Sequence, residues 1–155
     1  MQVKVKKLHQ DAVMPIYATT GAGAFDLCTI GYTEGGETCR DAADLSAEDS
    51  VTFRTGLAFE IPEGHVMYVF SRSGHGFMQD VRLANCVGVI DSDYRGEVMV
   101  KLVRESAFKR TVFTVRPGDR IAQAVIMPVP KVEFVEADDL TNTERGAGGF
   151  GSTGA

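Results

Sequence analysis

Short runs of alternating apolar and polar residues, separated by turns, dominate this chain and restrict it to one class of fold. The sequence has 17 glycines among 155 residues, and turn signals such as Pro62-Glu63-Gly64 separate successive runs. The number and spacing of the runs predict an all-β domain, either a sandwich, a jelly roll or a barrel. The expected strands are Val3–Lys7, Ala24–Ile30, Val51–Arg54, Leu57–Ile61, Val66–Ser71, Cys86–Ile90, Val98–Val103, Thr111–Val115, Arg120–Met127 and Val132–Val135.

The size and charge of the chain exclude several classes of function. A chain of 155 residues is long enough for one domain with a sizeable core. It has no apolar run near the ~18 residues that a membrane span needs, and its first residues alternate like a strand, so we expect neither a membrane segment nor export. A net charge of -5 argues against general binding of nucleic acid.

The cysteines favour a reducing compartment. Cys28, Cys39 and Cys86 are odd in number and lack CxxC spacing, so neither a disulfide framework nor a zinc site is expected. We therefore expect a cytoplasmic protein. Cys28 and Cys86 lie in strand-like runs, where we expect them to be small buried hydrophobic residues.

One polar insertion interrupts the strand pattern. Residues 33–50 are acidic and rich in small residues, and we expect a long surface excursion between two core strands, with a hint of helix only over Asp41–Asp49. Such a loop is either a tolerated insertion or a surface for a protein partner.

The richest stretch for chemistry is Asn85–Val98. Its flanking runs predict two strands of a hairpin, with Asp91, Asp93 and Tyr94 at the tip. Asp93 suits an ordinary turn. Asp91 directly follows the strand pattern, so it is the better candidate for a catalytic or ligand-binding carboxylate.

Three other stretches carry groups suited to an anion. Arg72, Ser73 and Gly74 enter a turn that can offer a guanidinium, a hydroxyl and backbone N–H groups. Gln123 lies between apolar positions, where an amide needs partners. The glycine-rich residues 145–155 cannot form a core, and they carry an arginine, an aromatic ring and two hydroxyls, which indicates a mobile lid that orders on a ligand.

Five motifs in order resemble the homotrimeric deoxyuridine triphosphatases, and the resemblance extends from Ala18 to the end of the chain. The matching segments are Gly21–Leu27, Arg72–Gly74, Asn85 with Gly88–Gly96, Gly118–Gln123 and Arg145–Gly154. The resemblance implies a jelly-roll domain over residues 1–144, a capping arm over 145–155, and hydrolysis of dUTP to dUMP and pyrophosphate. This reaction limits uracil in DNA and supplies dUMP for dTTP synthesis.

The same resemblance assigns roles to residues. Asp91 would orient and deprotonate the attacking water, and Tyr94 would pack on the deoxyribose and exclude a 2′-hydroxyl. Uracil would be read by Asn85 and by the backbone of Val89, Ile90 and Met99. The phosphates would be bound by Arg72, Ser73, Gly74 and Gln123. Arg145, Ser152 and Thr153 would close over the γ-phosphate, Phe150 would stack on the uracil, and Gly151 would also bind the substrate.

The resemblance also implies a metal and an assembly. Mg²⁺ would bind through the phosphates and waters, with Asp26 in the outer shell, and the sites would lie between the subunits of a trimer. Ser71, His75 and Ala24 depart from the usual motifs, and the long insertion suggests a phage source. Two alternatives stay open: a dCTP deaminase of the same fold, and an additional regulatory role through residues 33–50.

Overall fold

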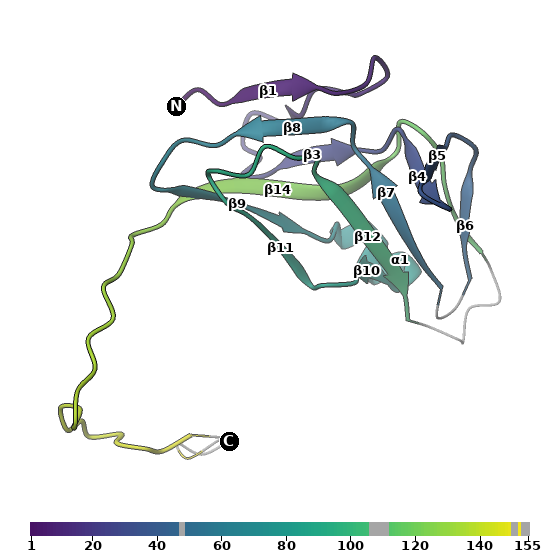
Figure 1. The fold of residues 1–155 in the computed structure, drawn as a ribbon. Helices are drawn as coiled ribbons and strands as arrows, with labels where there is room; N and C mark the ends of the chain where they lie inside the picture. Colours follow the sequence, from purple (N-terminus) through teal and green to yellow (C-terminus); the bar gives the residue numbers. More distant parts are fainter. Residues whose placement is uncertain (47–48, 106–111, 150–151, 153–155) are drawn as a thin grey trace.

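Two antiparallel sheets packed face to face form the body of the protein in the computed structural model (Figure 1). The structure describes residues 1–46, 49–105, 112–149 and 152. One sheet has the order β11-β9-β14-β3-β2 and the other has the order β10-β12-β7-β4-β5. Two short ribbons, β1-β8 and β13-β6, complete the jelly roll that the sequence predicts.

Strand bounds follow the alternating pattern closely. The first sheet contains β11 (Val87–Ile90), β9 (His65–Phe70), β14 (Arg120–Pro128), β3 (Phe25–Cys28) and β2 (Ile16–Tyr17). The second contains β10 (Val81–Leu83), β12 (Met99–Arg104), β7 (Ser50–Arg54), β4 (Gly31–Glu34) and β5 (Glu37–Cys39). The ribbons are β1 (Lys4–Lys7) with β8 (Leu57–Glu60), and β13 (Phe113–Val115) with β6 (Ala43–Leu45).

The core lies between the two sheets. Strand periodicity places every second side chain on the inner face, so the buried set includes Phe53, Leu57, Met67, Leu102 and Ile121. Among the described residues, no helix is long and apolar enough to cross a membrane.

Three expectations about local structure are wrong. Residues 41–49 contain the strand β6 and no described helix, because Ala43 and Leu45 are buried in the core and pair with β13. The insertion 33–50 is therefore partly core, with a β4–β5 hairpin, and it is not a plain surface loop. The turn expected after Arg72 is the start of a short helix, α1 (Ser73–Gln79).

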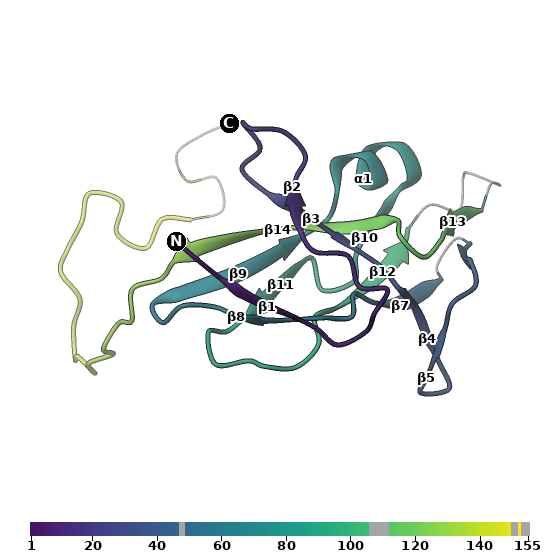
Figure 2. The ribbon, with the colours of Figure 1, turned by 90° about the horizontal axis from the view of Figure 1, so that it is seen from above.

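The end of the chain leaves the body of the protein. Residues 129–149 run from the end of β14 clear of both sheets in two views (Figures 1 and 2). The strand expected over Val132–Val135 is absent from this described segment, because it pairs with no other strand here. Phe134 is 91% exposed and Leu140 is 88% exposed.

Candidate functional site

The predicted hairpin proves to be an arch that joins the two sheets. Its first strand, β11, pairs with β9, and its second, β12, pairs with β10 and β7, so the two strands diverge. The expectation of a paired hairpin is wrong because each strand gains a different partner in the sandwich. We call residues 85–99 the arch. It is closed at its base, where the Ala84 N–H donates to the Lys101 carbonyl at 2.8 Å.

The arch brings together the residues expected to bind a pyrimidine and a sugar. Asn85 lies at its base, Val89 and Ile90 lie on β11, and Met99 begins β12 on the other side. Tyr94 lies in the connection, 43% exposed. A planar base between the diverging strands would therefore meet backbone groups whose directions are fixed by the sheets.

Asp91 follows the last residue of β11 and is exposed. It helps to line an open cavity of about 680 Å³, together with Val66, Tyr68 and Val89. A carboxylate at this point is attached to a rigid strand and is accessible to a water molecule, which are the requirements for a general base.

A second cluster of candidate residues lies at the opposite end of the same sheet. Arg72 Nε donates to Asp26 Oδ1 at 3.1 Å, and an Arg120 nitrogen donates to Asp26 Oδ2 at 3.1 Å. Gln123, which pairs across the strands with Asp26, donates from Nε2 to the Ser71 carbonyl at 3.0 Å. We call Asp26, Arg72, Arg120 and Gln123 the arginine cluster. One carboxylate facing two guanidiniums leaves net positive charge for an anion.

The helix α1 begins inside this cluster. Arg72 precedes its first residue, and Ser73 and Gly74 form its first turn. The Ser71 hydroxyl, at a position where the resembling family usually has proline, accepts the N–H of Leu83 at 2.9 Å. The departure from the motif therefore ties the start of α1 to β10.

His75 packs behind the arginine cluster. Its ring meets Phe113 edge-on at 5.0 Å, and Nε2 lies 3.4 Å from an Arg72 nitrogen. Burial, and then the charge of Arg72, lower the pKa of His75 below its ordinary value. A neutral ring at this position adds no further positive charge beside Arg72.

Two residues of the site were missed by the sequence reasoning. Arg120 was predicted as a strand residue within the motif Gly118–Gln123, but no role at the site and no contact with Asp26 was predicted for it. Glu97, 11% exposed, was not singled out, yet its carboxylate meets Arg54 at 2.5 Å. Both contacts join residues far apart in the sequence, so no local pattern reveals them.

The remaining expectations concern two cysteines and the residues of the arm. Cys86 is exposed and has a φ of 62°, so the expectation that it is buried is wrong. Cys28 is half-buried, and burial followed by the charge of Asp26 raises the pKa of its thiol. Arg145 and Ser152 lie on the exposed arm, and Phe150, Gly151 and Thr153 lie outside the described residues.

The two clusters of one chain cannot meet around one small ligand. Ile90 pairs with Met67, and Val87 pairs with Phe70, so Asp91 lies beside the Val66 end of β9 and Arg72 lies beyond the other end. Six residues of strand separate these positions, which is a distance of roughly 20 Å. A triphosphate is shorter than this separation, so one triphosphate cannot contact both Asp91 and Arg72 of the same chain.

The outer face of the first sheet supports contact between copies. Besides Asp26 and Gln123, this face carries apolar residues: Ile16 is 66% exposed, Val89 is 58% exposed and Met127 is 49% exposed, and Tyr68 and Phe70 lie among them half-buried. A sheet face that meets solvent is normally polar. An apolar patch of this kind indicates a protein interface.

The geometry at Asp26 limits what a metal could do there. Each of its carboxylate oxygens accepts from an arginine, which leaves lone pairs for a water molecule. Among the described residues, no group of three or more His, Cys, Asp or Glu side chains could hold a metal ion. The residues present therefore fit a hydrated ion that binds mainly through a ligand's phosphates.

Comparisons with known proteins converge on one family. Residues 10–154 match the family model described as dUTPase. The deoxyuridine 5'-triphosphate nucleotidohydrolase of Nautilia profundicola is 42% identical over 154 residues, which cover 99% of each chain. That of a Hydrogenobaculum strain is 44% identical over 154 residues, again covering 99% of each chain.

Solved structures share the fold. A mutant dUTPase of Staphylococcus bacteriophage 80alpha, in complex with dUpNHpp, superposes with a TM-score of 0.79 at 23% identity and covers 99% of both chains. A mutant dUTPase of phage phi11 of S. aureus, whose structure describes the coordination of a structural Mg(II) ion, gives a TM-score of 0.75 at 19% identity, over 92% of this chain and 100% of that one. At these identities the likeness concerns the fold alone.

Proposed function

This chain belongs to the dUTPase family and hydrolyses dUTP to dUMP, and we propose that its active site forms between copies, with the arch of one copy facing the arginine cluster of another. The single observation that carries this proposal is the separation of Asp91 from Arg72 within one chain, roughly 20 Å along the sheet.

We propose a homotrimer, the assembly implied by the resemblance to this family. The apolar outer face of the first sheet supports assembly, because burying an exposed valine or methionine stabilises by about 1.5–3 kcal/mol. A contact between copies would also place two separated halves of a site opposite each other.

In the proposed mechanism, Asp91 orients one water molecule and takes its proton as the oxygen attacks the α-phosphorus. The bond from the α-phosphorus to the oxygen that bridges to the β-phosphorus breaks, and pyrophosphate leaves. Arg72 offsets the charge of the triphosphate. Ser73, Gly74 and Gln123 complete the binding of the phosphates.

Selectivity in this proposal comes from the arch. Asn85 and the backbone of Val89, Ile90 and Met99 bind the uracil edge, and the limited space between β11 and β12 rejects a thymine methyl group. Tyr94 packs on the sugar and excludes a 2′-hydroxyl. Discrimination against an added group of this size depends on close packing.

We propose Mg²⁺ as the metal, held by the phosphates and by waters, with Asp26 accepting from a bound water. A bound Mg²⁺ would neutralise charge on the triphosphate and restrict its conformation. The contacts of Asp26 with Arg72 and Arg120 support an indirect role, because they occupy part of the carboxylate.

A nucleotide-specificity assay tests this function. We expect pyrophosphate release from dUTP in the presence of Mg²⁺, with little release from UTP, dTTP or dCTP and a marked loss after chelation. Equal rates on dUTP and UTP would refute the role of Tyr94. Ammonia release from dCTP would instead favour the deaminase alternative.

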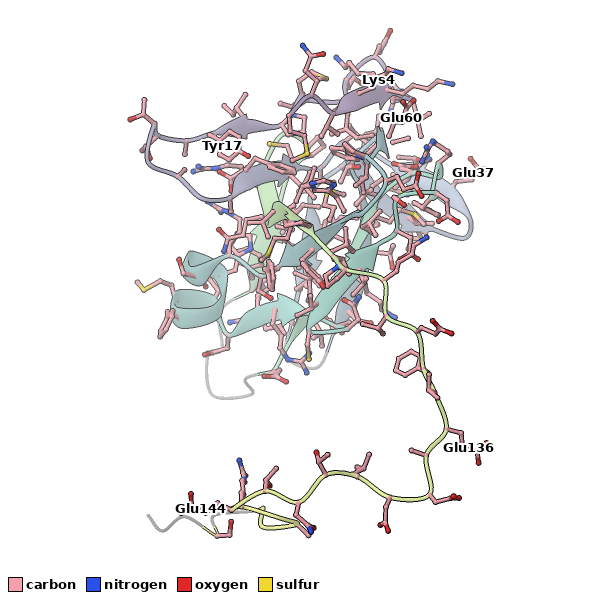
Figure 3. The ribbon with its side chains drawn as sticks, turned by 90° about the vertical axis from the view of Figure 1, so that its left-hand side faces the viewer. Lys4, Tyr17, Glu37, Glu60, Glu136 and Glu144 are labelled. Carbon is pink, nitrogen blue, oxygen red and sulfur yellow. The ribbon has the colours of Figure 1, made fainter. Side chains whose placement is uncertain are left out.

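The arm is proposed to close over the bound nucleotide of a neighbouring copy, through Arg145, Phe150, Gly151, Ser152 and Thr153. Figure 3 shows Glu136 and Glu144 on a segment that lies away from the body of its own chain. The hydrogen bonds among its described residues are local, such as that from Arg145 Nε to the Gly148 carbonyl, and a segment of this kind is available to order on a ligand.

Deletion of residues 145–155 is expected to lower kcat/KM for dUTP by about 10²-fold, because the phosphates lose their cap and water enters the site. The thermal unfolding temperature should stay unchanged, since the described residues of this segment, such as Arg145 and Ser152, lie outside the buried core. A deletion of the first residues, Met1 and Gln2, is the matched control and should leave the kinetics intact. Unchanged kinetics after deletion of the arm would remove its role as a lid.

Three free thiols, Cys28, Cys39 and Cys86, support the proposed location in a reducing cytoplasm. The role of residues 33–50 in binding a protein partner stays a prediction, and the burial of Ala43 and Leu45 gives part of this segment a structural purpose.

A further inference from the structure

The last residues of the arch are held in place by the carboxylate of Glu97, which has no role in the proposed mechanism. Glu97 Oε1 accepts the backbone N–H of Gly56 at 2.7 Å, and Oε2 accepts from Arg54 Nε at 2.9 Å. The Glu97 side chain is 11% exposed and that of Arg54 is 34% exposed. Two oxygens bound to two separate donors fix both the position and the rotation of the carboxylate.

The neighbouring backbone is fastened to the same segment. The Thr55 hydroxyl donates to the Val98 carbonyl at 2.6 Å, and the Val98 N–H donates to the Leu57 carbonyl at 2.9 Å. The end of the arch is therefore joined to residues 54–57 by side-chain and backbone contacts together. Gly56, with a φ of 66°, adopts the left-handed conformation that this close turn requires.

Tyr94 packs directly on Gly96 and Glu97, near the end of the arch. Its hydroxyl donates to the backbone carbonyl of Glu97 at 3.0 Å. A Cβ atom built on Gly96 would lie 2.4 Å from the Tyr94 hydroxyl oxygen and 2.5 Å from the adjoining ring carbon, so the ring packs on the bare backbone of that glycine. The place of the tyrosine ring thus depends on where Gly96 and Glu97 are held.

The insertion, residues 33–50, also contacts Arg54. An Arg54 nitrogen also donates to the Thr38 hydroxyl on β5, so the hairpin β4–β5 supports the arginine that binds Glu97. The hairpin joins β7 of the sheet through the β4–β7 pairs, in which Gly31 opposes Arg54.

We propose that Glu97 and Arg54 are positioning residues for Tyr94, and that they set the discrimination between dUTP and UTP; this inference rests on the proposed packing of Tyr94 against the deoxyribose. The pair acts through the backbone of the arch and does not touch the nucleotide. Thr38 should have a smaller effect on this discrimination, because it contacts Arg54 and acts on Tyr94 only through that residue.

The experiment compares kcat/KM for dUTP with kcat/KM for UTP, the latter measured at raised enzyme concentration. Glu97→Ala is expected to lower the dUTP-to-UTP ratio by about tenfold or more, since a tyrosine ring displaced by about 1 Å would no longer pack closely enough to exclude a 2′-hydroxyl. Glu97→Gln keeps an acceptor for the Gly56 N–H and should recover part of the ratio. Thr38→Val should lower the ratio by no more than about threefold.

The matched control is Glu60→Ala. Glu60 also accepts from a cation, Lys4, at 2.8 Å, and Figure 3 shows this pair at the open edge of β1 and β8. Its removal should leave the ratio unchanged. A merely structural role of Glu97 would lower both kcat/KM values together and leave the ratio as in the wild type, which would overturn the inference.

Tyr94→Ala tests the sugar contact of Tyr94 separately from the positioning role of Glu97. If it abolishes the discrimination and both Glu97 variants retain it, the positioning role is wrong and the proposed function stands. If Tyr94→Ala itself leaves the ratio intact, the proposed sugar contact is wrong. Should Glu97→Ala fail to fold, Glu97→Gln and Arg54→Lys decide the question, and an unchanged ratio in both overturns the inference.

Discussion

Replacement of Asp91 by asparagine is expected to lower kcat for dUTP by about 10²–10⁴-fold, the usual contribution of a general base. Asparagine preserves the size of the side chain and can still bind water, but it cannot accept the proton released during attack. Nucleotide binding should persist, because the arch and the arginine cluster stay intact. Pyrophosphate release and equilibrium binding of a non-hydrolysable dUTP analogue measure the two effects separately.

Asp93→Asn provides a matched control. Asp93 lies two residues further along the same exposed connection and lines the same cavity, so it experiences the same change of charge. It should retain the wild-type rate. A comparable loss in both variants would show that the overall charge of the arch matters, and an unimpaired Asp91→Asn enzyme would remove Asp91 from the mechanism.

Mixing two inactive variants is expected to restore activity. Asp91→Asn removes the proposed general base at the arch and Arg72→Ala removes a guanidinium from the arginine cluster, and each variant alone should be strongly impaired. In mixed oligomers, some sites combine the intact arch of one copy with the intact cluster of another. In a trimer that contains both variants, with each site built from two neighbouring copies, roughly a third of the sites are intact.

Co-expression with two affinity tags, followed by purification on both, supplies oligomers that contain each variant. Pyrophosphate release per site then measures the recovery. Oligomers that carry Asp91→Asn in every copy and differ only in their tags serve as the control and should show no recovery. Mixed oligomers without recovery would contradict a site shared between copies, whatever their measured size.

Local sequence pattern determined most of the strands. Apolar-rich runs beside turn signals, Val66–Ser71 and Arg120–Met127, predicted β9 and β14 almost to the residue, because short runs of this kind are typical of buried strands. Asp91 was also recognisable, since a carboxylate that directly follows an apolar strand has an ordered backbone behind it.

Strand partners could not be predicted in the same way. Val87–Ile90 and Met99–Arg104 are adjacent in the chain and resemble a hairpin, yet they join different sheets. Pairing depends on which strand offers a free edge in the folded sandwich, and this property belongs to the whole chain. The same reason explains β6, where an acidic segment supplies two buried residues, Ala43 and Leu45.

The sequence by itself determined an all-β domain, and it identified Asp91 as the candidate base and residues 145–155 as a candidate arm, because composition and strand pattern act locally. Only the tertiary structure decided that Asp91 and Arg72 lie at opposite ends of one sheet. The same holds for the contact between Glu97, near the end of the arch, and Arg54 on β7. These relations join residues distant along the chain. Their physical cause is the register of the strands, which fixes distances that no local pattern encodes.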